Sequence, residues 1–365
     1  MLTGRLSLMK KNNILFVVPC QPGIGGVATI SSLLLEEYTD IPNIRFFDAT
    51  KISCRWKNVL SRFLLMLKVV KYCIYNHNSK ILTFCGADAS FWEKVVWALI
   101  SRLFGVHLYV IMVAGDFPVF YSRLSSKVKF IIKRVLKNVI IGAQSKSWSE
   151  FFCSVFPYSE VRVVSAGVDT KFFIPTRETK SKNNTYVTIL YVGWIIAYKG
   201  IYDILSAVKI LQSKVNGFVV ELVGPFYEDV EKVRNVIDDF GIHENVILYG
   251  PIQSRELLRD KYQAAEVFIL PSHFEGFPCV LLEALSSGLP CIGTKVGGIP
   301  DILDDGKCGI LVAKQSPEEL ADAMLKMIKD VELRIRIGEQ SRERAVRNYS
   351  LQTSMASYKN LLGID

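Results

Sequence analysis

Histidine is scarce in this chain, with four residues among 365. The eight cysteines are scattered along the chain and form no Cys-x-x-Cys pair. The residue types and spacings that zinc sites use are therefore missing, and we expect no metal centre. Cysteines without a disulfide pattern are expected to be reduced, as in a cytoplasmic protein.

Long uninterrupted apolar runs are also missing, although the mean hydropathy of +0.26 is high. The best candidate for a membrane span is Val95–Val113, which Arg102, Gly105 and His107 interrupt. We interpret it as a buried helix followed by a buried strand. The first dozen residues are too short and too poor in apolar residues for a signal peptide, so we expect a cytoplasmic protein.

Acidic residues are few in the first half of the chain. Residues 1–175 hold 22 Lys and Arg against 10 Asp and Glu, whereas residues 176–365 hold 22 against 25. This asymmetry favours an anionic partner for the first half, and a solvated basic face without a partner is the alternative. We expect no nucleic acid, because no nucleic-acid motif accompanies the charge.

Strands and helices alternate twice along the chain, which predicts an α/β protein with two parallel sheets. The first series begins with the continuous apolar run Ile14–Val18, typical of a buried parallel strand. The polar segment 176–185 predicts a linker, after which the series restarts at Val187. We therefore expect domains at 1–175 and 176–345, and a C-terminal helix within 346–365 that packs back towards the first domain.

Two glutamates eight residues apart dominate the segment 271–290, PSHFEGFPCVLLEALSSGLP. A strand should end at Leu270 and a helix should start near Cys279, so the first N–H groups of that helix offer an anion site. Glu283, one turn into the helix, can accept two vicinal hydroxyls of a ribose. Glu275 lies in the preceding loop, where a sugar on a bound diphosphate would sit. The alternative is two exposed glutamates beside an ordinary helix.

This segment resembles the E-x7-E motif of glycosyltransferase family 4, the retaining GT-B enzymes. The resemblance continues through Gly288–Asp301, with the Gly297-Gly298 pair, to Asp305-Gly306 and Cys308–Val312. It implies two Rossmann-like domains that face a central cleft, with acceptor binding in the first and donor binding in the second.

The resemblance also assigns roles to single residues of the motif. It implies that Glu283 holds the ribose and that Glu275 contacts the donor sugar. The N–H groups of Gly276 and Phe277 would bind sugar hydroxyls. Those near Val280 and Leu281 would bind phosphate.

A second segment, Tyr191–Gly200, is similar to the family's V-G-R-x-x-x-x-K-G sequence. Gly193 and Lys199 match the family pattern, and Lys199 would stabilise the negative charge on the leaving diphosphate. Trp194 replaces the family's arginine and supplies no charge. Either another basic residue compensates, or the leaving group is stabilised less.

In the first half, Gly25 and Gly26 resemble the family's Gly-Gly loop after the first strand, where glycine lets the backbone approach a donor closely. A plain tight turn is the alternative. The family's histidine, which often contacts the donor's 6-hydroxyl, is absent from the segment Met112–Phe117. We therefore hypothesise a donor with an altered C6, such as a 6-deoxy sugar.

The resemblance implies a metal-independent retaining transferase without cofactor, using a UDP- or GDP-sugar as donor. A lipid-linked saccharide of bacterial surface polysaccharide synthesis is the expected acceptor. A sugar-nucleotide epimerase of GT-B fold and an inactive nucleotide-sugar binding subunit stay open as alternatives. A nicotinamide dehydrogenase is disfavoured, because neither first strand is followed by a convincing G-x-G-x-x-G.

Two segments interleave basic and large apolar residues, Trp56–Tyr72 and Lys127–Lys137. Both are typical of helices that lie on an anionic bilayer, which suggests a peripheral protein on the inner face of the cell membrane. Core helices with solvated lysines are the alternative.

Overall fold

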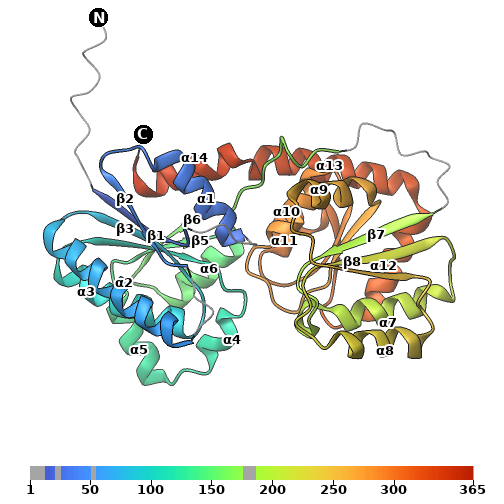
Figure 1. Ribbon diagram of the computed structural model, residues 1–365, viewed down its shortest axis with the longest axis horizontal. Coiled ribbons are helices and arrows are strands. Elements are labelled where there is room, and N and C mark those ends of the chain that lie inside the picture. Colours follow the sequence, from blue (N-terminus) through green and yellow to red (C-terminus); the bar gives the residue numbers. More distant parts are fainter. Residues whose placement is uncertain (1–12, 21–25, 51–54, 176–185, 365) are drawn as a thin grey trace, which may run out of the picture. The chain divides into compact units, whose positions relative to one another are not determined.

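The computed structural model describes residues 13–20, 26–50, 55–175 and 186–364. They divide into two compact units (Figure 1): unit 1 is Met1–Val164 with Ser357–Asp365, and unit 2 is Ser165–Ala356. Each unit contains one six-stranded parallel sheet. The prediction of an α/β chain with two parallel sheets is confirmed. The predicted linker 176–185 lies outside the described residues.

The sheet of unit 1 has the strand order β2-β1-β3-β4-β5-β6. Its strands are β1 (Ile14–Val18), β2 (Ile44–Asp48), β3 (Lys80–Cys85), β4 (His107–Met112), β5 (Ile140–Ala143) and β6 (Glu160–Val163). Its helices are α1 (Gly26–Tyr38), α2 (Arg55–Tyr75), α3 (Ala89–Leu103), α4 (Phe117–Ser122), α5 (Ser126–Val135) and α6 (Lys146–Val155). Because parallel connections are right-handed, α1 lies on one side of the sheet and α2, α3 and α5 on the other (Figure 1).

The core of unit 1 lies between the sheet and the layer that α2, α3, α5 and α6 form. All five residues of β1 are buried, as its continuous apolar run predicts. An aromatic cluster fills the space beside α3 and α6. Its members are Phe91, Phe117, Trp148, Phe152 and Phe156.

The sheet of unit 2 has the order β12-β11-β10-β7-β8-β9. Its strands are β7 (Val187–Val192), β8 (Phe218–Val223), β9 (Val246–Gly250), β10 (Val267–Leu270), β11 (Cys291–Thr294) and β12 (Gly309–Val312). Its helices are α7 (Ile201–Gln212), α8 (Val230–Phe240), α9 (Arg255–Ala264), α10 (Cys279–Ser286), α11 (Ile299–Ile302), α12 (Pro317–Lys329) and α13 (Val331–Tyr349), with the 3-10 turns η1 (Ala197–Lys199) and η2 (Asp304–Gly306). The loops that follow β7 and β10 open at the same edge, because these neighbouring strands are parallel.

The segment 165–175, which the sequence placed in the first domain, belongs to unit 2. Its backbone is bound by side chains and backbone of that unit. Arg342 donates to the carbonyl oxygens of Thr170 and Phe173, and Ser286 Oγ donates to the Phe173 oxygen at 2.7 Å. Val168 N donates to the Tyr349 oxygen at 2.8 Å. These bonds place the unit boundary before residue 165.

Where one C-terminal helix was expected within 346–365, two helices meet: α13 ends at Tyr349, and α14 (Leu351–Leu362) begins after Ser350. Ser350 has an extended backbone (φ −61°, ψ 155°), and its Oγ accepts from Thr353 N at 3.2 Å. A serine that caps the second helix therefore ends the first. The last residues of α14 belong to unit 1, where Lys359 pairs with Glu37 at 2.9 Å.

No helix among the described residues combines the length and apolar character needed to cross a membrane. The seven cysteines that the structure describes are all free, and Cys153 is exposed.

Candidate active site

Glu275 lies in the loop between β10 and α10, and its exposed fraction is 8%. Lys199 Nζ donates to its Oε1 atom at 2.6 Å, and Ser272 Oγ donates to the same atom at 2.8 Å. No donor from the described residues reaches the other oxygen, Oε2. The structure thus joins the two residues predicted to be catalytic, and one carboxylate oxygen can still accept from a ligand.

Lys199 is positioned by close contact between two loops. It ends η1, and Gly200 follows with φ +79° before α7 begins. A Cβ atom at Gly200 would lie 2.1 Å from the Pro271 carbonyl oxygen, so only glycine fits. The Tyr198 oxygen also accepts from His273 N at 2.9 Å. The Lys-Gly pair of the sequence motif is therefore held against the loop that carries Glu275.

The side chains of His273 and Asp203 join the loop after β10 to the first turn of α7. His273 Nε2 lies 2.6 Å from Asp203 Oδ2, and both side chains are largely buried. Asp203 stands in the first turn of α7. Sequence reasoning did not single out this pair, because 70 residues separate its members. Its only signal was the place of His273 two residues before Glu275.

The glycine pair at 297–298 supports the Glu275 loop from the opposite side. Gly297 has φ +54°, and a Cβ atom there would lie 1.8 Å from the Glu275 carbonyl oxygen. Gly298 N donates to the Gly276 oxygen at 2.8 Å. Phe277 is buried and packs edge-on against Tyr349, with ring centroids 5.7 Å apart. The predicted contacts of Gly276 and Phe277 N–H groups with sugar hydroxyls stay predictions.

Helix α10 begins at Cys279, as the sequence predicted. The first N–H groups of a helix have no intrahelical acceptor, which makes them available to an anion. Leu281 N, however, donates to the Pro278 oxygen at 3.1 Å, so this N–H group already has a partner. Val280, which is half-buried, is the other residue predicted to bind phosphate.

Glu283 lies one turn into α10 and is partly exposed. Tyr262 OH donates to its Oε2 atom at 2.9 Å. Burial raises the pKa of this carboxyl from 4.5 to about 7, although the Tyr262 hydrogen bond and the charge of Arg255 lower it. The residue predicted to hold a ribose is therefore a carboxyl that changes charge near neutral pH.

The segment after β7 carries Gly193 and Trp194 in place of a Gly-Arg pair. Tyr191 OH donates to the Trp194 carbonyl oxygen at 2.8 Å, which fixes the start of the loop. The Trp194 ring packs on Tyr227 with centroids 4.8 Å apart, and the two residues are 45% and 60% exposed. An exposed aromatic pair therefore occupies the position where the family carries a charge.

Two further predictions concern unit 1. Gly26 begins α1, whereas Gly25 lies outside the described residues. The segment after β4 leads into α4 and contains no histidine, and His107 stands exposed at the other end of β4. Across the residues that the structure describes, no group of three or more His, Cys, Asp or Glu is placed to hold a metal ion.

Comparison with known families matches residues 173–344 to the glycosyl transferases group 1. The match covers a little under half of the chain and lies wholly within unit 2, so the likeness to this family is a likeness of that region. The region that matches contains both loops described above, with Lys199, Glu275 and Glu283.

Among curated proteins, the chain is 29% identical over 214 residues to a D-inositol 3-phosphate glycosyltransferase of Corynebacterium glutamicum, which covers 55% of this chain and 51% of that protein. It is 23% identical over 274 residues to the N-acetyl-alpha-D-glucosaminyl L-malate synthase of Bacillus anthracis, covering 74% and 69%. The chain spans about half the length of the inositol phosphate transferases it matches.

Solved structures share the fold over nearly the whole chain. The sucrose-phosphate synthase of Thermosynechococcus elongatus matches with a TM-score of 0.75 and 19% identity, covering 96% of this chain and 98% of that one. HepE of Anabaena, solved with UDP, matches with a TM-score of 0.73 and 17% identity, covering 96% and 100%. The GT-B fold expected from the sequence is confirmed.

Proposed function

We propose that this protein is a retaining glycosyltransferase that moves a sugar from a nucleoside diphosphate sugar to an acceptor hydroxyl. The observation that carries the proposal is the Lys199–Glu275 pair at 2.6 Å, which lies in the loops after two adjacent strands of the region that matches the group 1 glycosyl transferases. A cation and a carboxylate at this edge suit a diphosphate and a polyhydroxylated ring, respectively.

In this reaction the bond between the anomeric carbon and the β-phosphate oxygen breaks, and the acceptor oxygen bonds to the same face of the sugar. The acceptor's proton passes to the released diphosphate. Lys199 stabilises the charge that develops on the leaving diphosphate. Glu275 orients the sugar through its Oε2 atom, and Glu283 binds the ribose hydroxyls. No metal ion or cofactor takes part in this scheme.

The donor is proposed to be a UDP- or GDP-sugar. The structures of HepE with UDP and with UDP-glucose support a nucleotide sugar as the class of ligand. Because the loop after β4 lacks the family's histidine, we propose a sugar altered at C6, such as a 6-deoxy or N-acetylated 6-deoxy sugar. A donor screen by thermal shift tests this, because a tight ligand raises the apparent melting temperature. A preference for hexoses with a free 6-hydroxyl would overturn it.

The acceptor is proposed to be a lipid-linked saccharide of bacterial surface polysaccharide synthesis, such as an O-antigen, bound by the residues of unit 1. The excess of positive charge in residues 1–175 supports it, and implies a location on the inner face of the cell membrane. The names of related proteins contain inositol 3-phosphate and L-malate, which are small molecules, so a small acceptor is the alternative. Assays with both acceptor types, using one donor, decide between them.

The test of the transferase reaction compares the wild type with Glu275→Ala and with the exposed-surface control Glu343→Ala. We expect nucleoside diphosphate release that needs both donor and acceptor, is lost in Glu275→Ala and is kept in Glu343→Ala. Conversion of the donor without acceptor would favour the epimerase. Donor binding without turnover by the wild type, with every acceptor tried, would favour the binding subunit.

A further inference from the structure

Helix α3 was expected to be buried, yet one side of it is exposed and apolar. Trp92, Val96, Leu99 and Leu103 are 41–77% exposed. Their spacing of four, three and four residues puts them on one face of the helix. The opposite face is buried in the core of unit 1. The fold of unit 1 therefore leaves a row of large apolar side chains in water.

Helix α2 shows the same division. Its buried residues are Leu65, Val69, Tyr72 and Cys73. Its exposed apolar residues, each 44–75% exposed, are Val59, Leu60, Phe63, Leu64, Leu67, Ile74 and Tyr75. Single exposed apolar residues are ordinary on a surface, but a row of seven on one helix is not.

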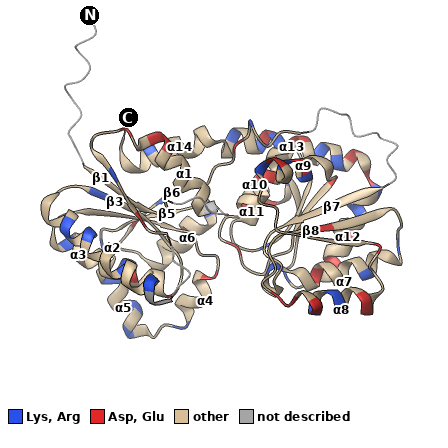
Figure 2. Ribbon diagram, in the orientation of Figure 1, with Lys and Arg blue, Asp and Glu red and all other residues tan. Residues whose placement is uncertain are grey.

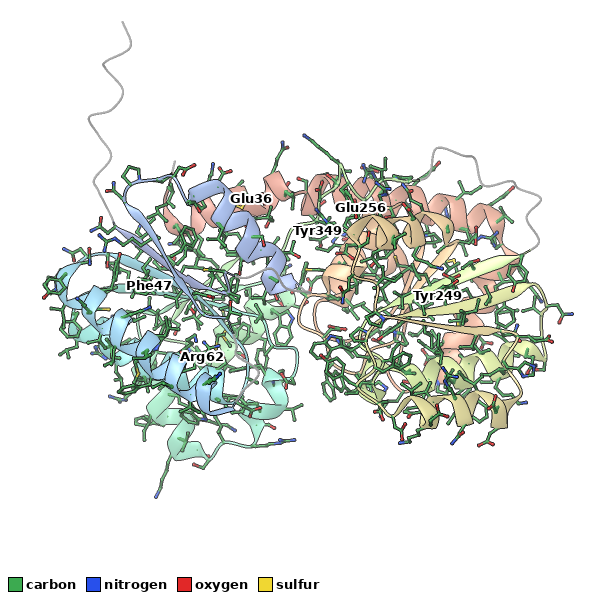
Figure 3. The ribbon with its side chains drawn as sticks, viewed as in Figure 1. Glu36, Phe47, Arg62, Tyr249, Glu256 and Tyr349 are labelled. Atoms are coloured by element: carbon green, nitrogen blue, oxygen red, sulfur yellow. The ribbon has the colours of Figure 1, made fainter. Side chains whose placement is uncertain are left out.

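The exposed sides of α2, α3 and α5 belong to one layer of unit 1. Helix α3 contacts both α2 and α5. Arg62 of α2, labelled in Figure 3, reaches Glu93 of α3 at 3.9 Å. Helix α5 adds Phe130 and Ile131, each 58% exposed. We call this surface the α2–α3–α5 face, defined by the exposed residues of these three helices.

The charge on the α2–α3–α5 face has one sign. Helices α2 and α5 contain no acidic residue (Figure 2). The one acidic residue of α3, Glu93, is bound by Lys94 at 2.8 Å, so its charge is compensated. Exposed basic side chains lie beside the apolar ones. They are Lys57, Lys68, Lys71, Arg102, Lys127 and Arg134.

We propose that the α2–α3–α5 face docks on the surface of an anionic lipid bilayer. Large apolar side chains enter the boundary of the acyl chains, and the surrounding lysines and arginines contact anionic headgroups. Large apolar side chains bordered by lysines and arginines are the pattern with which amphipathic helices bind anionic bilayers. The inference rests on the proposed function in one respect: a lipid-linked acceptor would be reached from this surface.

Sedimentation with lipid vesicles tests the proposal. The full chain, without donor, is mixed with vesicles of phosphatidylcholine alone or with phosphatidylglycerol added. We expect binding to the anionic vesicles that weakens with salt. Replacing Lys68, Lys71 and Lys127 by Gln should weaken it on the order of a hundredfold, at about fivefold per charge. Leu99→Ser with Leu103→Ser should weaken it roughly tenfold.

The matched control is Ile335→Ser with Val346→Ser, two residues of unit 2 that are each 45% exposed. This control should bind vesicles as the wild type does. Equal binding to neutral vesicles, or no loss in the α2–α3–α5 variants, would overturn the proposal. A dimer of the wild type in solution that dissociates in the Leu99→Ser, Leu103→Ser variant would also overturn the proposal, because the face would then bind a second copy of the chain.

The same samples separate this inference from the proposed function. Transfer to a water-soluble acceptor analogue should be unchanged in the variants of the α2–α3–α5 face. If the wild type transfers sugar but binds no vesicle, the proposed docking surface is wrong and the proposed transferase function stands. If the wild type binds vesicles but transfers no sugar, the proposed transferase function is wrong and the proposed docking surface stands.

Discussion

The two units have parallel sheets of the same size, yet they expose different chemistry. In unit 2, polar side chains near the edge of the sheet are bonded to each other, as Lys199 is to Glu275 and His273 to Asp203. In unit 1, the layer of α2, α3 and α5 presents lysines and arginines among exposed apolar side chains. A shared architecture therefore does not decide what each unit binds. The side chains on its loops and outer faces decide it.

The difference suggests a division of labour, in which unit 2 carries the transfer chemistry and unit 1 the attachment to a surface. Pairs of variants, one in each unit, test whether the two units differ in this way.

The largest effect is expected from Lys199→Met in unit 2, compared with Lys68→Met in unit 1. Loss of the Lys199 charge should lower kcat/KM by roughly 10²–10³-fold, because the leaving diphosphate loses its cation. Lys68→Met should leave kcat/KM with a soluble acceptor unchanged. Steady-state kinetics measure both, and circular dichroism checks that Lys199→Met is folded, since it leaves the Glu275 carboxylate without its cation. Equal activity of the two variants would refute the role of Lys199.

A second pair compares glycines with positive φ in the two units. Gly297→Ala places a Cβ atom 1.8 Å from the Glu275 oxygen, whereas Gly105→Ala, at φ +65°, meets no atom within 4 Å. Gly105→Ala should cost about 1–2 kcal/mol of unfolding free energy through backbone strain alone. Gly297→Ala should cost about 3 kcal/mol and also lower donor affinity, because the Glu275 loop must move. Urea unfolding and calorimetric titration with donor measure these effects.

A third pair adds one positive charge to each unit. Trp194→Arg restores the cation that the family carries and should tighten nucleoside diphosphate binding about tenfold, through charge-assisted hydrogen bonds. Trp92→Arg, at a residue of similar exposure in unit 1, should not change this affinity. Calorimetric titration with UDP and GDP gives both values. Weaker binding in Trp194→Arg would mean that the Trp194–Tyr227 pair itself contacts the nucleotide.

The last prediction concerns the pH dependence of unit 2. Because burial raises the pKa of Glu283 from 4.5 to about 7, the folded chain keeps a proton there that the unfolded chain releases. The stability from this carboxyl is therefore complete below about pH 4.5 and declines as the pH rises to 7. Glu283→Gln stays neutral, and its stability relative to the wild type should rise by about 1–3 kcal/mol between pH 5 and 8. Urea unfolding at both pH values tests this, and no change would show that the carboxyl is ionised throughout.

Much of the fold followed from local patterns. The strands β1 and β7 appear where the sequence predicted the two series to begin, because buried parallel strands need apolar side chains on both faces. Strand β2 was not predicted, since only part of its sequence is buried at the edge of the sheet. The unit boundary was placed eleven residues late, because the bonds that hold 165–175 come from α10 and α13, far along the chain.

The candidate site was predicted in part. Glu275, Glu283 and Lys199 were named from their motifs, whereas the contact between Lys199 and Glu275 depends on the pairing of β7 with β10 in the folded sheet. The His273–Asp203 pair was missed, because nothing in the local sequence connects β10 to the first turn of α7. The exposed row on α3 was missed for a related reason. Apolar residues at helical spacing predict a buried helix face, but the spacing does not show whether another element covers that face.

Local sequence sets which segments become strands and helices, and which residue types stand at the ends of the parallel strands. These depend on local periodicity and on loop composition, which neighbouring residues set. The tertiary structure alone decided which of two apolar helix faces is buried, which carboxyl has a raised pKa, and which cation meets Glu275. Burial and pairing depend on residues distant in the chain, and only the folded arrangement brings them within a few ångströms of each other.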